Sequence, residues 1–226
     1  MLIVAVDTSG RKGSIALCRG DSDSFEVLQV IALEGGTYSA QLMPRIAEAL
    51  QQNKLQKAQV GGFVVVSGPG SFTGLRVGLA TVKGLCEVLQ KPLAAVSMLE
   101  AVALTAGRPG QTATVALAAG RGEIYVGEYQ VLTDRASRVR EYLAKLDAFV
   151  AETVNAGSQL LTTDPQVAEA LQAANANVEL VPAVHADEIG RIGIRKLLAG
   201  ETVDPATVDV NYIRRSDAEI FSAPKH

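Results

Sequence analysis

The chain has 226 residues, a formal net charge of −3 and 48% hydrophobic residues, which is the composition of an ordinary globular protein with one large or two small lobes. The negative charge, the absence of tryptophan and the 4% aromatic content exclude a nucleic-acid binder with a basic face or a base-stacking platform. Cys18 and Cys86 are isolated and the 2 histidines lie far apart, so no metal site is expected. The N-terminus predicts a strand and not a signal peptide, and no apolar run is long enough to span a membrane. A cytoplasmic protein without membrane contact is therefore expected.

The first half of the chain predicts an antiparallel meander of strands followed by mixed helices and strands. The expected strands cover residues 2–8, 14–18, 25–33, 62–67 and 92–96, and the expected helices cover 39–52 and 72–90, with another beginning at 97.

Turn residues at 107–110 predict a lobe boundary, dividing residues 1–108 from 109–226. The pattern then starts again, which predicts a duplicated α/β architecture with a mixed sheet in each lobe. The tail near 208–216 is expected to fold back onto the first lobe or to remain mobile. The second set of strands is expected at 112–118, 123–132, 138–142, 158–162 and 178–181, and its helices near 143–152, 164–174 and 187–198.

The most unusual stretch runs from Phe63 to Leu89, where an apolar strand meets a glycine turn and then a helix that Ser71 or Thr73 can cap. Glycines inside a helix cost roughly 1 kcal/mol each, so Gly74, Gly78 and Gly84 together indicate that another helix or a backbone comes very close. The turn itself has two interpretations, a phosphate cradle or a tight connection without a ligand. It matches neither the P-loop nor the dinucleotide-binding fingerprint.

Asp7 ends the first strand and is followed by Thr8 and Ser9. In two-lobed phosphotransfer folds, a carboxylate there holds a metal-bound water and the neighbouring groups meet phosphate. The matching hairpin, residues 118–122, contains no carboxylate, so a magnesium-nucleotide site is half missing. A turn or capping role is the alternative for Asp7. No serine has a histidine at a spacing suited to nucleophilic catalysis, and His185 is expected to be a turn residue before a helix.

Several segments together resemble the TsaB (YeaZ) family. The most specific is the string SGPGSFTGLRVG at residues 67–78, supported by VAVDTS at 4–9 and QLMP at 41–44. RGEIY at 121–125 and YIR at 212–214 also fit. The structural motif within the specific string comprises Gly68, Pro69, Gly70, Ser71, Phe72 and Thr73.

The resemblance implies an actin-like ATPase fold, shared with sugar kinases, Hsp70 and the ribonuclease H-like proteins, that has lost its own catalysis. It implies a scaffold that binds and activates TsaD, the protein that transfers a threonylcarbamoyl group to the adenosine beside the tRNA anticodon. The small ATPase TsaE joins this assembly, tRNA is met only through the complex, and no cofactor is expected apart from ATP or ADP at the complex interface.

In that family, the helices matching 39–52 and 72–90 dock on TsaD, and the same face can form a homodimer. The expected interface residues are Leu42, Met43, Ile46, Gly74, Leu75, Arg76, Gly78, Leu79 and Val82. A charge at Gly78 or Leu79 is expected to abolish the complex while leaving the fold intact. Arg76, a cation in the first helical turn, is expected to meet a carboxylate or an anion. The expected remnant of a nucleotide site comprises Asp7, Thr8, Ser9, Gly120 and Gly122.

The sequence also departs from the family pattern. Tyr38 stands where a histidine is frequent, and residues 118–120 are Ala-Ala-Gly where Asp-Ala-Arg is common. The H-x-x-x-H motif of TsaD is absent. Two rival functions remain: a small actin-fold ATPase or acyl or sugar kinase that uses Asp7, and a peptidase, for which no nucleophile-base pair is present.

Overall fold

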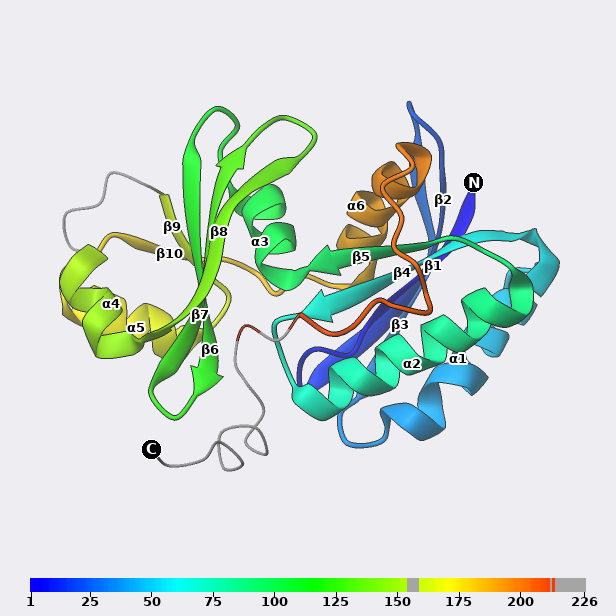
Figure 1. Cartoon of the computed structure of the whole chain (residues 1–226), viewed down its shortest axis with the longest axis horizontal. Helices are drawn as coiled ribbons and strands as arrows, with labels where there is room; N and C mark the ends of the chain where they lie inside the picture. Colours follow the sequence, from blue (N-terminus) through cyan, green and yellow to red (C-terminus); the bar gives the residue numbers. More distant parts are fainter. Residues whose placement is uncertain (154–158, 212, 214–226) are drawn as a thin grey trace. The chain divides into compact units, whose positions relative to one another are not determined.

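The computed structural model describes residues 1–153, 159–211 and 213, and it divides the chain into two compact units (Figure 1). The first unit comprises Met1–Ala101 and Val184–Val210, and the second contains Val102–Ala183. Each unit is built on a five-stranded mixed sheet. Among the described residues, no helix is both long and apolar enough to cross a membrane.

The first sheet has the order β3-β2-β1-β4-β5, in which β1 pairs antiparallel with β2 and parallel with β4. The register places Val4 opposite both Leu17 and Phe63. The predicted meander and the two parallel strands after it are confirmed. The strands are β1 (Leu2–Asp7), β2 (Lys12–Gly20), β3 (Phe25–Glu34), β4 (Val60–Gly68) and β5 (Leu93–Ser97).

Three helices cover the two faces of this sheet: α1 (Tyr38–Gln52), α2 (Phe72–Leu89) and α6 (Ala186–Leu198). α1 and α2 lie side by side (Figure 1). Adjacent residues of a strand point to opposite faces. Val4 lies on the face under α1 and α2, whereas its neighbours Ile3 and Ala5 lie close to Gly190 of α6. α6 therefore covers the face opposite α1 and α2.

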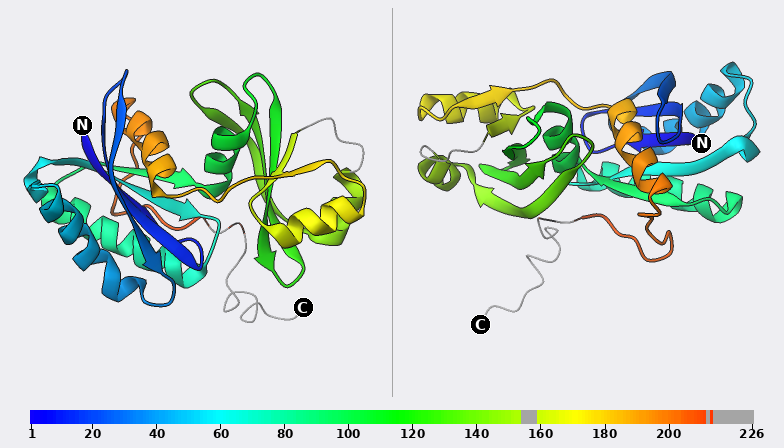
Figure 2. Two further views of the ribbon diagram at one scale, coloured as in Figure 1. Left: turned by 180° about the vertical axis from the view of Figure 1, so that it is seen from behind. Right: turned by 90° about the horizontal axis from the view of Figure 1, so that it is seen from above.

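The second sheet repeats the first, with the order β10-β9-β6-β7-β8 and the same mixture of antiparallel and parallel pairs. Two short helices, α4 (Leu146–Thr153) and α5 (Pro165–Ala173), lie next to each other beside it (Figure 2). Their Phe149, Val167 and Leu171 complete a core with residues of the sheet. The predicted duplication is confirmed. The strands are β6 (Thr112–Gly120), β7 (Glu123–Val131), β8 (Ala136–Lys145), β9 (Gln159–Thr162) and β10 (Val178–Leu180).

Two details of the expected lobes are corrected. The contacts divide the units between Ala101 and Val102, inside α3 (Met98–Ala106), because the turn at 107–110 ends this helix and does not separate the units. α6, expected in the second lobe, packs on the first sheet. Its glycines permit this close approach, since a Cβ at Gly193 would lie 2.2 Å from Cγ1 of Val64.

The segment after α6 continues along the first unit. The backbone N–H of Val203 donates to the carbonyl of Leu93 on β5 at 2.9 Å, and Lys83 Nζ of α2 donates to the carbonyl of Val208 at 2.9 Å. Up to Val210, the chain thus returns to the first unit, one of the two expected outcomes. Tyr212 and Arg214 of the YIR match lie outside the described residues.

Candidate functional site

α2 presents a buried face and an exposed face. Gly74, Gly78 and Val82 belong to the buried face. The exposed face follows a four-residue spacing, as expected for one side of a helix. Its residues are Phe72, Arg76, Ala80, Gly84 and Val88.

The glycines of the buried face leave room for Thr8, which directly follows β1. A Cβ at Gly74 would lie 2.1 Å from the carbonyl oxygen of Thr8, and one at Gly78 would lie 2.2 Å from Thr8 Oγ1. Real side chains do not approach this closely, so both positions require glycine. Of the two expected reasons for these glycines, another helix or a backbone, the structure shows the backbone at Gly74, whereas at Gly78 the close neighbour is the Thr8 side chain.

The glycine turn before α2 packs against the same segment. The N–H of Ser71 donates to the carbonyl of Ser9 at 2.6 Å, and a Cβ at Gly70 would lie 2.4 Å from that oxygen. Ser71 is the helix cap, accepting from the N–H of Gly74 at 3.3 Å. Because the amides of Ser71 and Gly74 already have partners, the geometry favours the tight connection over the phosphate cradle.

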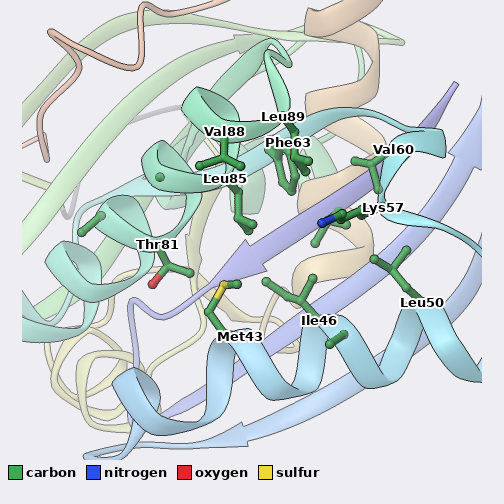
Figure 3. A pocket seen from close by; sticks show the side chains of 14 residues that line it. Met43, Ile46, Leu50, Lys57, Val60, Phe63, Thr81, Leu85, Val88 and Leu89 are labelled. Atoms are coloured by element: carbon green, nitrogen blue, oxygen red, sulfur yellow. The ribbon is translucent and has the colours of Figure 1, made fainter.

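A groove of about 530 Å³ lies between α1 and α2 (Figure 3), and we name it the α1–α2 groove. Val4 and Phe63 of the sheet also line it and are themselves buried. The wall from α1 consists of Met43, Ile46, Ala47 and Leu50. The wall from α2 consists of Ala80, Thr81, Gly84, Leu85, Val88 and Leu89.

The groove is apolar apart from one cation. The hydroxyl of Thr81 donates to the carbonyl of Val77 at 2.8 Å, so its hydrogen is used within the helix. Lys57, in the turn before β4, is the charged residue of the lining. The apolar residues of the walls remain accessible, since Met43 is 50% and Val88 is 78% exposed. An apolar concave surface of this kind is typical of a site that another molecule covers.

The structure separates the expected interface residues into two groups. Met43 and Ile46 line the groove and Arg76 is exposed, so these three are placed on or near an accessible surface. The others are core residues of the first unit, and a partner could reach them only by unpacking α1 or α2. This burial corrects the expected set for Leu42, Gly74, Leu75, Gly78, Leu79 and Val82.

Sequence reasoning missed Ala47, Ala80, Gly84, Leu85 and Val88. A signal for part of this set was present, because Ala80, Gly84 and Val88 recur every four residues and therefore lie along one side of α2. A Cβ at Gly84 would have no atom within 4 Å outside its own helix. Gly84, unlike Gly74 and Gly78, therefore has no internal reason to be glycine.

Arg76 lies beside Phe72 on the exposed face. Its guanidinium carbon is 3.8 Å from the centroid of the Phe72 ring, which is a cation–π contact. The expected carboxylate or anion partner of Arg76 stays a prediction.

The other candidate site surrounds Asp7. Its Oδ1 accepts from the N–H of Ser9 at 2.9 Å and from the Ser9 hydroxyl at 2.7 Å. Burial raises the pKa of this carboxyl, while the hydrogen bonds from Ser9 and the charge of His185 oppose the rise. The Tyr38 hydroxyl donates to the carbonyl of Gly10 at 2.8 Å, tying α1 to the same loop. Thr8 Oγ1 is buried without a hydrogen-bond partner among the described residues and faces Gly78.

The corresponding turn of the second unit is much simpler. Gly120, Arg121 and Gly122 have φ values of 77°, 57° and 74°, and Gly120 pairs with Glu123. Two residues with positive φ make the tight hairpin turn that suits antiparallel strands. The expected nucleotide residues Gly120 and Gly122 therefore have a local structural role that requires no ligand.

The remaining candidate groups have structural roles in their surroundings. His185 is the N-cap of α6, and its N–H donates to Glu188 Oε2 at 2.6 Å, in agreement with the expected turn role. Burial raises the pKa of the Cys18 thiol to about 12 and that of Cys86 to about 11. At neutral pH, both are protonated and poor nucleophiles.

Comparison with known proteins identifies the family. A family model described as TsaD, tRNA N6-adenosine threonylcarbamoyltransferase, matches residues 35–195. The chain belongs to this family. A Bacillus subtilis relative named tRNA threonylcarbamoyladenosine biosynthesis protein TsaB is 33% identical over 130 residues, which cover 58% of this chain and 56% of the relative. The chain thus spans a little over half the length of this TsaB protein. The resemblance to the TsaB (YeaZ) family is confirmed.

Solved structures establish the fold. A Pseudomonas aeruginosa protein described by its similarity to peptidase YEAZ superposes with a TM-score of 0.76 at 22% identity, covering 94% of this chain and 99% of that one. The activator of the 2-hydroxyisocaproyl-CoA dehydratase from Clostridium difficile superposes with a TM-score of 0.51 at 8% identity, covering 89% and 97% of the two chains. This member of the TsaD family has the expected actin-like ATPase fold.

Proposed function

We propose that this chain is a non-catalytic subunit of the machinery that makes N6-threonylcarbamoyladenosine in tRNA, and that it binds and activates TsaD. The family and the name of the Bacillus subtilis relative support the pathway. The α1–α2 groove supports the role within it, because a scaffold needs a surface for its partner.

The observation that carries the proposal is the exposed apolar lining of the groove. Met43 and Val88 lie on opposite walls and are largely accessible, although both could be removed from water by a partner. Each Å² of apolar surface buried contributes about 25 cal/mol. A docked TsaD helix that covers both walls would bury this apolar surface, and the free energy of that burial would stabilise the complex.

A non-catalytic role is supported by the two hairpin turns. Asp7 is buried and its pKa is raised, whereas a carboxylate that holds a metal-bound water is needed in its charged form. The matching turn of the second unit has glycines and an arginine in place of a carboxylate. We therefore expect this chain to hold no nucleotide by itself, and ATP or ADP to enter only at the interface with TsaD.

The other partners belong to the same proposal. In the absence of TsaD, two copies would cover each other's grooves and form a homodimer. TsaE would join the complex after TsaD has docked, and tRNA would be reached only through the complex.

The proposal is tested with Met43→Glu and Val88→Glu, measured as the dissociation constant for TsaD from the same organism. Both residues are exposed, so we expect the two variants to fold normally, which circular dichroism checks. In each variant, the new glutamate charge would be buried when TsaD docks. We expect at least about a hundredfold weaker binding. The control is Val139→Glu on β8 of the second unit, where the side chain is 64% exposed. Wild-type affinity in both groove variants would refute the assignment of the interface.

A further inference from the structure

Lys57 is not explained by an apolar docking surface. Among the described residues, its ammonium group has no ion pair or hydrogen bond, although it lines a groove whose other members are apolar or internally satisfied. Its side chain extends into the groove between the two helices (Figure 3). A lysine placed in this way will lose part of its water when a partner docks.

Within the described part of the chain, no carboxylate pairs with this ammonium group. Glu48 on α1 is engaged by Arg45, whose Nη1 lies 2.7 Å from Glu48 Oε2, and by Gln52 at 3.0 Å. The described residues that line the groove include no aspartate or glutamate. Removing an ammonium group from water without a counter-charge costs several kcal/mol. A partner that fills the groove must therefore supply the negative charge or weaken its own binding.

Resting on the proposed function, we propose that the TsaD segment in the α1–α2 groove is a helix whose apolar row ends in a carboxylate that pairs with Lys57. The walls favour a helix because their residues recur every three or four positions on both α1 and α2, which is the spacing of ridges that a third helix fills. The charge favours an acidic residue at the end of that helix which lies over Lys57.

A small amphipathic acid fits the observations less well. It could fill the floor between Ile46 and Leu85 and place its carboxylate on Lys57. It would leave the outer parts of Met43 and Val88 in water, because these residues form the rims and not the floor. A helix covers the floor and the rims together.

The test compares Lys57→Met and Lys57→Glu with a matched control, Lys54→Met. Lys54 is an exposed lysine of the same connection that does not line the groove, so its removal changes the net charge equally. The dissociation constant of the full chain for TsaD is measured by calorimetry at low and high salt. If Lys57 meets a carboxylate, Lys57→Met weakens binding about tenfold and reduces its salt dependence, and Lys57→Glu weakens it further. Lys54→Met binds within about twofold of the wild type.

If no carboxylate faces Lys57, the substitution Lys57→Met changes the affinity in the opposite direction. This outcome can be told apart from a failure of the proposed function. Without a facing carboxylate, Lys57→Met removes only a desolvation cost and binds as tightly as the wild type or more tightly, which would overturn the inference and leave TsaD docking intact. If the wild-type chain does not bind TsaD, the proposed function fails first. Saturable binding of dodecanoate to the chain alone, lost in Lys57→Met and unaffected by TsaD, would assign the groove to a small acid and overturn the helix.

Discussion

The two units share one strand order but differ in the helices that cover their sheets. In the first unit, α1 and α2 have 15 and 18 residues, whereas α4 and α5 at the corresponding places of the second have 8 and 9. The short helices place Phe149, Val167 and Leu171 in the core of their own unit. The long helices do the same with one face and carry a second apolar face that their own unit does not cover. The two units therefore share a duplicated topology, and the longer helices of the first unit form the α1–α2 groove.

The hairpin turns also differ between the units, and the longer one belongs to the first unit. Between β1 and β2, the chain takes a longer path in which Thr8 contacts α2 and Asp7 is enclosed beside Ser9. Between β6 and β7, the turn needs only Arg121 and Gly122. The first turn organises the helices that form the groove, and the second only reverses the chain. The contact of Thr8 with α2 thus supports one wall of the α1–α2 groove.

The largest effect is expected from closing the space that Gly78 leaves for Thr8. Gly78→Ala should lower the free energy of unfolding by roughly 2–3 kcal/mol, because its Cβ would meet the buried Thr8 Oγ1. Gly78→Glu should prevent the first unit from folding, since a buried charge is added to the same clash. Urea unfolding followed by circular dichroism measures both.

This outcome replaces the expectation that a charge at Gly78 or Leu79 leaves the fold intact. The physical reason is that both residues are buried in the first unit. A Gly78→Glu variant that unfolds at the same urea concentration as the wild type, and has lost only its binding to TsaD, would restore the earlier expectation.

A smaller effect, of opposite sign, is expected at Asp7. Burial raises the pKa of this carboxyl, so the folded chain binds the proton more tightly than the unfolded chain does. The free energy of unfolding therefore falls as pH rises above about 4, the unfolded value, and through the folded pKa. Asp7→Asn keeps the acceptor for Ser9 and removes the charge, so it should stabilise the chain by about 1 kcal/mol at pH 7. The gain should vanish near pH 4.

The same variant distinguishes the proposed scaffold from an ATPase that uses Asp7. The scaffold predicts the stability gain and normal binding to TsaD. The ATPase predicts magnesium-dependent turnover by the isolated chain that Asp7→Asn abolishes. Turnover is measured as phosphate release with and without the substitution. A gain in stability without any change in phosphate release would remove the ATPase.

Most of the fold could be predicted from the sequence because its signals are local. The apolar run at β4, the turn at Gly68–Gly70 and the period of α2 each lie within one element. The position of α6 could not be predicted in this way. Its apolar face shows that it packs on a sheet, but which of the two duplicated sheets it covers depends on contacts between residues more than a hundred positions apart, such as Gly193 with Val64.

The groove lies on the two helices for which an interface was predicted, but many of the residues named for that interface lie on their buried faces. Glycines in α2 correctly indicated close approach, yet the sequence does not distinguish approach from inside the unit, at Gly78, from approach from outside. The carbonyl and hydroxyl of Thr8, which occupy the inner side, are brought there by β1. Lys57 carried no signal, because an isolated lysine in a polar turn becomes notable only when the groove beside it is known.

The smallest effect is expected at Gly84, and it separates the two faces of α2 directly. Gly84→Ala places a methyl group in open space within a helix, so it should raise the free energy of unfolding by roughly 0.5–1 kcal/mol. The matched change at Gly78 has the opposite sign. Thermal unfolding of the two single variants measures the difference, and a loss of stability at Gly84 would contradict the assignment of an open face.

Gly84 weakens the free chain, and the proposed docking gives a reason for the glycine. Nothing inside the first unit approaches Gly84, so the cost of a helical glycine there has no internal compensation. If a TsaD helix packs against the α2 wall of the groove, the same methyl group that stabilises the free chain should hold that helix away and weaken binding several-fold. A variant that is both more stable and equally tight in binding would mean that the partner helix approaches α1 more closely than α2, and the occupied part of the groove would then be its α1 wall.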